Sequence, residues 1–217
     1  MGDNERPASQ QPSGDMDTIN THVYTNLDLI PRFNGPTLED LTAEQRDLRN
    51  VVLAHRPHGL TGPFGPWLST PAILRPAEEL GRVCRFGTSL ARHESELLML
   101  LTAVKARCGT VTDVHVGEAL RAGLKMEVIS AIPRNDEFSL AAVKERVLPL
   151  LNNGREKAIA SFAAELLDTS TVGDETYSTT KAAVGGNDSV LVEITTIVGY
   201  YVLGSFILNA FRMPSKR

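Results

Sequence analysis

The sequence has few of the residues that mark secreted, metal-binding or nucleic-acid-binding proteins. Its two cysteines, Cys84 and Cys108, are too few for a disulfide framework and lack the spacing of a metal site. Such sparse cysteine usage favours a reducing compartment, so we expect a cytoplasmic protein. The formal net charge is −4, and there is no basic stripe with interleaved aromatic residues. Nucleic acid is therefore not an expected partner.

The N-terminal segment lacks the apolar core of a secretory signal. Residues 1–18, MGDNERPASQQPSGDMDT, are polar, and the opening residues lack the Ser or Thr of a myristoylation motif. We expect residues 1–35 to be a disordered polar leader. Residues 36–217 are expected to form a single domain, because a chain of 217 residues with 42% hydrophobic content is enough for one well-buried core.

Strand patterns are also scarce, and helical periodicity dominates the chain after the leader. Residues 41–55 carry a capping box, Thr42 with Gln45, ahead of apolar residues at helical spacing. Residues 56–71 are rich in Pro and Gly and are expected to form a structured loop. Further helices are expected at 74–87, 92–107, 112–123, 125–132, 139–151, 154–168, 174–183 and 188–211. The predicted fold class is therefore all-α.

One apolar run, residues 189–211, is long enough to cross a bilayer. It contains a single charged residue, Glu193, but also threonines, tyrosines and glycines, and no second span or signal accompanies it. We therefore expect no membrane partner. A helix that is apolar all round is instead expected to be covered on both faces, in the core or against another subunit. This favours a homo-oligomer.

An acidic residue interrupts the apolar run of residues 93–107. At about 100° per residue, Thr102 and Lys105 fall on one side of this helix, which we expect to face water, and Glu96 lies on the opposite side. A buried carboxylate needs a partner. The nearest candidate along the chain is His115, on the next helix. If the two helices form an antiparallel hairpin, the two side chains can meet.

Three segments resemble the carboxymuconolactone decarboxylase and AhpD-like superfamily. They are LTAEQRDLRNVVLAHRP, ESELLMLLTAVKARCGTVTDVHVGEALRAGLKMEVISAI, and a C-terminal segment with the pattern VE-T--VGYY-----LNAF, and they cover most of residues 40–214. The resemblance implies an AhpD-like multi-helix bundle, cytoplasmic in most members, that assembles through apolar helices as trimers or hexamers. It also implies a proton-transfer site on Glu96 and His115, without cofactor or metal.

Departures from this resemblance bear on the reaction. Members that reduce disulfides or peroxides carry Cys-x-x-Cys before the histidine, whereas here Cys108 fills the first position and Val111 the second. Without a resolving thiol the redox cycle is broken. Many other members have Tyr-Glu-Trp before the histidine, where this chain has Thr110-Val111-Thr112, and Val202 replaces an asparagine in the last helix. The pocket has therefore been rebuilt.

The favoured function is cofactor-free proton transfer by Glu96 and His115 on a small acid or lactone. Decarboxylation of an oxo or lactone acid fits best, and a related isomerase or cyclase reaction is kept beside it, in a biosynthetic or aromatic-catabolic pathway. Two alternatives stay open. One is an AhpD-type thiol peroxidase or disulfide reductase that uses Cys108. The other is a non-catalytic helical oligomer that binds a small molecule, with the buried pair only pinning two helices.

Five further residues are weaker candidates for substrate binding: Arg107, His55, His58, Tyr200 and Tyr201. The arginine falls on roughly the same helical face as the buried acid and could hold a substrate carboxylate. The two loop histidines flank a proline and could line a cleft mouth. The tyrosines are expected to pack in the core, where a phenol could reach the site.

A metal site is the last alternative. His93 and Glu96 lie three residues apart and, with His115, could imitate a set of two histidines and one carboxylate. The helical spacing, however, turns His93 toward the flank of its helix. We therefore expect no metal.

Overall fold

The structure, a computed structural model, describes residues 31–56 and 59–214 of the chain. Within these ranges it contains helices and no strand, so the predicted all-α class is confirmed. The helices are α1 (Ala43–His55), α2 (Phe64–Leu68), α3 (Pro71–Phe86), α4 (Arg92–Lys105), α5 (Gly109–Arg121), α6 (Met126–Ala131), α7 (Leu140–Arg146), α8 (Gly154–Thr169), α9 (Asp174–Ala183) and α10 (Asp188–Phe211), with short 3₁₀ turns η3 (Asn135–Glu137) and η4 (Leu148–Leu150).

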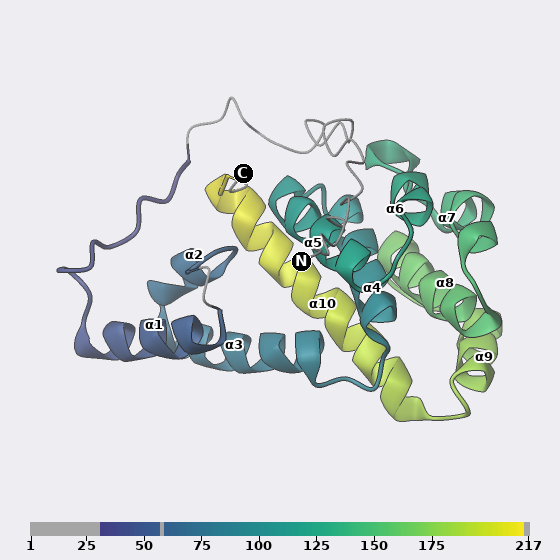
Figure 1. Cartoon of the computed structure of the whole chain (residues 1–217), viewed down its shortest axis with the longest axis horizontal. Helices are drawn as coiled ribbons and strands as arrows, with labels where there is room; N and C mark the ends of the chain where they lie inside the picture. The colour runs from purple at the N-terminus through teal and green to yellow at the C-terminus, as the bar shows by residue number, and fades with distance from the viewer. Residues whose placement is uncertain (1–30, 57–58, 215–217) are drawn as a thin grey trace, which may run out of the picture.

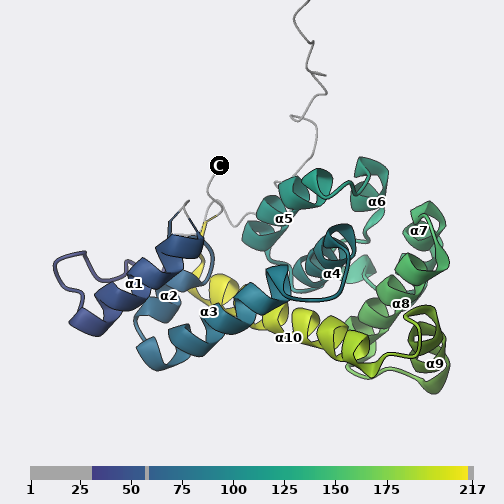
Figure 2. The ribbon, with the colours of Figure 1, turned by 60° about the horizontal axis from the view of Figure 1, so that its bottom comes forward.

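Helix α4 lies at the centre of the fold, in contact with α5, α8 and α10 (Figure 1). Helices α1, α2 and α3 pack together at one end, and α7, α8 and α9 pack together at the other. The long helix α10 runs between these two groups and contacts α3, α4 and α8 (Figure 2). The last helix therefore connects the two ends of the described fold.

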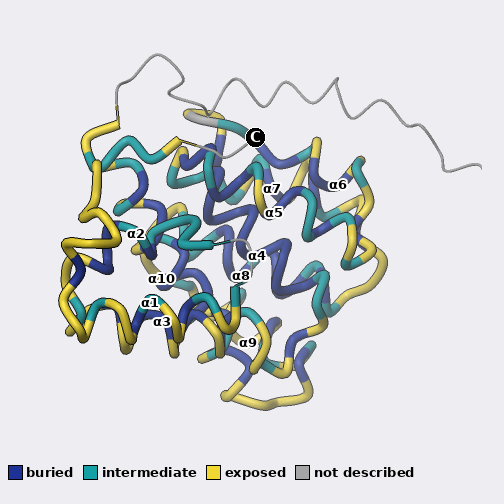
Figure 3. The backbone as a smooth tube through the Cα atoms, turned by 60° about the vertical axis from the view of Figure 1, so that its left-hand side comes forward, coloured by how far each residue is buried: buried dark blue, intermediate teal, exposed yellow. Residues whose placement is uncertain are grey.

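Every residue of α4 from Glu94 to Val104 is buried (Figure 3). The expectation that Thr102 faces water is wrong, because neighbouring helices cover this side of α4 as well. The Thr102 hydroxyl needs no water, since it donates a hydrogen bond of 2.8 Å to the Leu98 carbonyl. The helix is partly exposed at its two ends, and at Lys105 the ammonium group lies 3.1 Å from Asp168.

Helix α10 is apolar all round but covered on one side only. The apolar residues of its exposed side, named here the outer stripe, are Val192, Gly199, Leu203, Phe206 and Ala210, and the exposed Thr195 lies among them. Its two most exposed large side chains, at positions 192 and 206, are 63% and 60% accessible. Among the described residues α10 is the one helix long and apolar enough to cross a membrane, and half of its apolar window is buried in the fold. A single half-buried helix of this kind is weak support for a membrane span.

Several predicted boundaries agree with the structure. The capping box at α1 is present, with the Gln45 amide donating to Thr42 Oγ1 at 3.2 Å and the Thr42 amide donating to Gln45 Oε1 at 2.9 Å. The predicted ranges 154–168, 174–183 and 188–211 match α8, α9 and α10 to within one residue. Local signals therefore place these helices correctly.

Other boundaries differ for identifiable reasons. The loop expected at 56–71 contains the short helix α2, and α3 begins at Pro71 rather than 74, because proline is well suited to a first helical turn. Helix α5 begins at Gly109 rather than 112. The helix expected at 139–151 breaks after Arg146 into α7 and a 3₁₀ turn, just ahead of Pro149.

Residues 1–30 of the expected leader lie outside the described residues. The described part begins at Pro31, and Arg32 donates a backbone hydrogen bond of 2.9 Å to the Phe211 carbonyl at the end of α10. The rings of Phe33 and Phe211 meet edge to face at 5.7 Å. Arg32 and Phe33 therefore contact the C-terminal end of α10.

Candidate functional site

The structure joins Glu96 of α4 to His115 of α5. His115 Nδ1 lies 2.7 Å from Glu96 Oε2, and the side chains are 7% and 0% exposed. The meeting of these two side chains across the α4–α5 hairpin, predicted from helical spacing, is therefore confirmed. As a carboxylate, Glu96 can only accept a hydrogen bond, so this contact places the ring proton on Nδ1. Nε2 is then the ring nitrogen that can accept a proton.

Arg92, one turn before the buried acid, is a third member of the group. Its Nη2 lies 2.7 Å from Glu96 Oε1, but no N–H is directed at that oxygen, so the contact is an ion pair without a well-formed hydrogen bond. Arg92 Nη1 donates instead to the Arg85 carbonyl at 2.6 Å, and its other partner is Glu118 at 3.5 Å. The buried carboxylate thus has a partner on each of its two oxygens.

Beside His115 lies a cavity of about 90 Å³. Drug-sized ligands occupy pockets of roughly 300–1,000 Å³, so this cavity suits a smaller molecule. Its wall combines apolar side chains with a few polar ones: Arg56, Phe64, Arg85, Val111, His115, Tyr200, Tyr201 and Leu208. The cavity is therefore a mostly apolar chamber with a histidine and two guanidinium groups in its wall.

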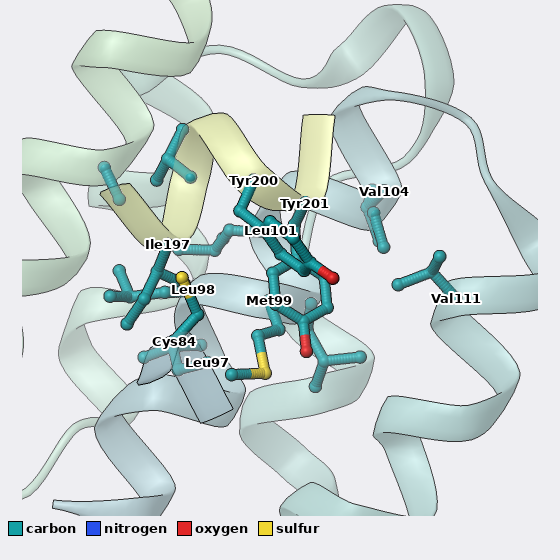
Figure 4. Close-up of a cluster of buried hydrophobic side chains, with 14 of the residues drawn as sticks. Cys84, Leu97, Leu98, Met99, Leu101, Val104, Val111, Ile197, Tyr200 and Tyr201 are labelled. Atoms are coloured by element: carbon teal, nitrogen blue, oxygen red, sulfur yellow. The ribbon is translucent and has the colours of Figure 1, made fainter. Parts of the chain in front are cut away.

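Tyr200 and Tyr201 follow each other on α10, and both line the cavity. The Tyr201 ring meets the His115 ring edge to face at 5.0 Å, and the two tyrosine rings are 5.7 Å apart. Both phenol oxygens point away from α10 (Figure 4). Burial raises the pKa of both phenols, so both remain neutral hydrogen-bond donors. These two weaker candidates are therefore placed at the site.

Both cysteines are free, buried thiols outside the cavity wall. Burial raises the pKa of the Cys108 thiol, and it raises that of Cys84 to about 11. A thiol with a raised pKa is a poor nucleophile at neutral pH. Val111, at the position of the missing resolving cysteine, does line the cavity, so the site presents an isopropyl group where a redox relative would present sulfur.

Two further weak candidates, Arg107 and His55, do not line the cavity. Arg107 is exposed and forms an ion pair with Asp136, and its expected place on the Glu96 face is wrong, because α4 ends at Lys105 and Arg107 has a left-handed φ of 53°. His55 is half-exposed and lies 3.5 Å from Glu78. His58 lies outside the described residues.

The histidine on the flank of α4 has a different partner. His93 Nε2 lies 3.3 Å from Glu156 Oε1, a carboxylate that also accepts hydrogen bonds from Asn152 and Asn153. His93 therefore does not join Glu96 and His115 in one group. No cluster of three or more His, Cys, Asp or Glu side chains suitable for a metal occurs in the described part of the chain.

Comparison with solved structures defines the fold class. The chain resembles an uncharacterized peroxidase-related protein with an AhpD core from Ralstonia eutropha JMP134, with a TM-score of 0.67, 18% identity, and coverage of 87% of this chain and 93% of that chain. It resembles an uncharacterized peroxidase-related protein from Silicibacter sp. TM1040 with a TM-score of 0.66, 13% identity, and coverage of 85% and 92%. The chain therefore has the AhpD-like fold.

A third similar structure is a protein of unknown function from Agrobacterium tumefaciens, with a TM-score of 0.56, 18% identity, and coverage of 72% of this chain and 99% of that chain. No family model matches the sequence, and no curated protein matches it. The resemblance inferred from the sequence is confirmed as a fold. At these identities the likeness carries no reaction with it.

Three arginines at the site were not predicted from the sequence. Arg92 had a usable signal, because it precedes Glu96 by four residues, the spacing of neighbours on one helical face. Arg56 and Arg85 had none. Arg56 follows α1 and Arg85 lies on α3, and only the packing of α1 against α3, and of α3 against α10, brings them to one cavity.

Proposed function

We propose that the chain is a cofactor-free enzyme that moves protons at carbon in a small oxo or lactone acid. The observation that supports this most is the buried pair: Glu96 holds Nδ1 of His115 at 2.7 Å, and the same ring lines the cavity. Nε2 has no partner among the described residues, so it is available to a ligand. An oriented imidazole at the wall of a small apolar chamber is suited to general acid–base catalysis.

In a decarboxylation at this site, the bond between a carbon and its carboxylate breaks, and CO₂ leaves. The bonding electron pair moves onto the neighbouring carbonyl group as an enolate. Protonated His115 then donates its Nε2 proton to the carbon, and solvent returns a proton to the ring. Apolar walls such as Val111 and Leu208 favour the dispersal of charge from the leaving carboxylate. An isomerisation would use the same nitrogen to remove a proton and return it elsewhere.

The direct test is a screen of small oxo and lactone acids in D₂O, followed by mass spectrometry. Protein that moves protons at carbon should release CO₂ or place deuterium next to the carbonyl group of at least one acid. The His115→Ala protein supplies the background. Solvent deuterium or CO₂ at the background level for every acid would argue against the proposal.

We expect no turnover as a peroxidase with dithiol reductants. Cys108 is buried with a raised pKa, and Val111 stands where a resolving thiol would be needed. The measurement is the rate of hydroperoxide loss in the presence of dithiothreitol, with Cys84→Ser as the control. Rapid loss that persists in the control and disappears in Cys108→Ser would support the thiol peroxidase alternative instead.

We also propose that the chain is a cytoplasmic homotrimer or homohexamer. The outer stripe of α10 leaves Leu203 and Phe206 46% and 60% exposed, and apolar stripes of this kind favour association. Light scattering at micromolar concentration should show an oligomer, and the Leu203→Glu/Phe206→Glu protein should be smaller. The Leu38→Glu control also changes an exposed leucine, but away from this helix, and should keep the oligomer. A monodisperse wild-type monomer would contradict this proposal.

A further inference from the structure

Arg56 has an unusual environment for a charged side chain. It follows α1 as the C-terminal cap, is half-buried and lines the cavity. Among the described residues no carboxylate lies within ion-pair distance of it. Its guanidinium carbon stacks 4.2 Å above the Phe64 ring, and its buried Nε has no hydrogen-bond acceptor. A desolvated guanidinium group of this kind lacks the compensation that buried charges normally have.

The neighbouring arginines show the contrast. Arg85 lies 3.7 Å from Glu118, and Arg92 lies 2.7 Å from Glu96. The cavity wall includes Arg56 and Arg85 but no carboxylate from the described residues. Burial lowers the pKa of the Arg56 guanidinium, because desolvation disfavours its positive charge. An anion in the cavity would supply the missing partner.

The two tyrosines connect this arginine to the histidine. The rings of His115 and Tyr201 are 5.0 Å apart, and those of Tyr201 and Tyr200 are 5.7 Å apart. Of the charged groups that act on Tyr200, Arg56 has the largest effect, and its positive charge favours the phenolate. Neither phenol has a hydrogen-bond partner among the described residues. The polar groups of the cavity therefore run from Arg56, past two free hydroxyl donors, to His115.

We propose that Arg56 is the carboxylate-binding residue of this cavity and that the phenols of Tyr200 and Tyr201 donate hydrogen bonds to the carbonyl oxygen of the same ligand. A guanidinium group matches a carboxylate with two parallel N–H donors, which fixes orientation as well as charge. This arrangement places the bound carboxylate at the far end of the ligand from His115, so this carboxylate stays on the ligand, and a carboxylate lost as CO₂ would be a second one beside His115. The assignment rests on the proposed function for its carbonyl group, whereas the carboxylate at Arg56 follows from the unpaired charge.

The test is a binding measurement, so it does not depend on turnover. Calorimetry at fixed ionic strength would compare 4-oxopentanoate with its uncharged methyl ester, which has the same carbonyl group. We expect wild-type protein to bind the acid, and Arg56→Gln to weaken this binding by about tenfold or more, the loss of a charge-assisted hydrogen bond. Affinity for the ester should be the same in both proteins. Tyr201→Phe should weaken the binding of both ligands.

Two controls keep the result specific. Arg75→Gln removes the same charge from α3 at a site 64% exposed and should leave both affinities unchanged. Arg56→Lys keeps the charge without the planar fork and should retain part of the affinity, which also separates a binding defect from a folding defect. The assignment is overturned if wild-type protein fails to bind the acid, or if Arg56→Gln binds it as tightly as wild type. His115→Ala should still bind the acid. If the protein binds the acid through Arg56 but moves no proton in the D₂O screen, the catalytic proposal fails and this assignment stands.

Discussion

Replacing His115 with alanine should lower turnover by about two to four orders of magnitude, the contribution expected of general acid–base catalysis. Glu96→Gln should have a similar effect, because it keeps the size of the side chain but loses the charge that holds Nδ1 at 2.7 Å. The double variant should be little worse than either single variant, since members of one catalytic unit fail together. The measurement is turnover of an acid that emerges from the D₂O screen.

A matched pair joins the same helix, α4, to α8. His93 lies 3.3 Å from Glu156, outside the cavity wall, so His93→Ala and Glu156→Gln remove a comparable contact without touching the site. Both should retain turnover. Thermal melting separates the alternatives, because a purely structural buried pair should cost about 3–5 kcal/mol of stability when broken. A Glu96→Gln protein that melts and turns over like wild type would remove the main support for an acid–base role.

Gly81→Ala should destabilise the protein by about 1–3 kcal/mol, the usual cost of overpacking a core. A β-carbon at this position of α3 would lie 2.1 Å from the Tyr200 hydroxyl oxygen and 2.6 Å from the ring carbon that bears it. The clash outweighs the roughly 0.5–1 kcal/mol that alanine gains over glycine inside a helix. For a chain of this size the melting temperature should fall by roughly 2–4 °C per kcal/mol.

Gly117→Ala in α5 is the matched control, because the nearest atom to its new β-carbon is the Arg121 guanidinium nitrogen at 3.8 Å. It should be neutral or slightly stabilising. In a Tyr200→Leu background, Gly81→Ala should lose most of its cost, since the obstructing ring is gone. An unchanged melting temperature for Gly81→Ala in the wild-type background would show that the ring moves freely, contrary to its close packing against α3.

The central pair could be predicted from sequence because its geometry is local. Helical spacing put Glu96 on a covered face, and a break between two helices brought His115 back past it. The prediction that Arg107 lies on the Glu96 face of the helix was wrong, also for a local reason. Helix α4 ends at Lys105 and Arg107 itself has a left-handed φ, so a helical wheel carried past the helix end assigned it to a face that does not exist.

Other parts of the site depend on tertiary packing. No spacing in the sequence connects Arg56, at the end of α1, with Arg85 on α3. These two residues converge only because α1 packs against α3 and α3 packs against α10. The burial of Thr102 is similar, since the number of neighbours around a helix is a property of the whole fold. Hydrophobic periodicity identifies the most apolar side of a helix. It cannot identify a water-facing side when neighbouring helices cover every side.

Two helices that support opposite ends of the cavity differ in how easily they open: α4 carries Glu96, the partner of His115, and α1 ends at Arg56. Helix α4 is buried from Glu94 to Val104, so its backbone amides should exchange with solvent only when the whole domain unfolds. Helix α1 buries only Leu48 and Val52 and can detach at a much lower free energy. A ligand can therefore enter and leave by local opening at the Arg56 end, while the Glu96–His115 hydrogen bond keeps its geometry throughout.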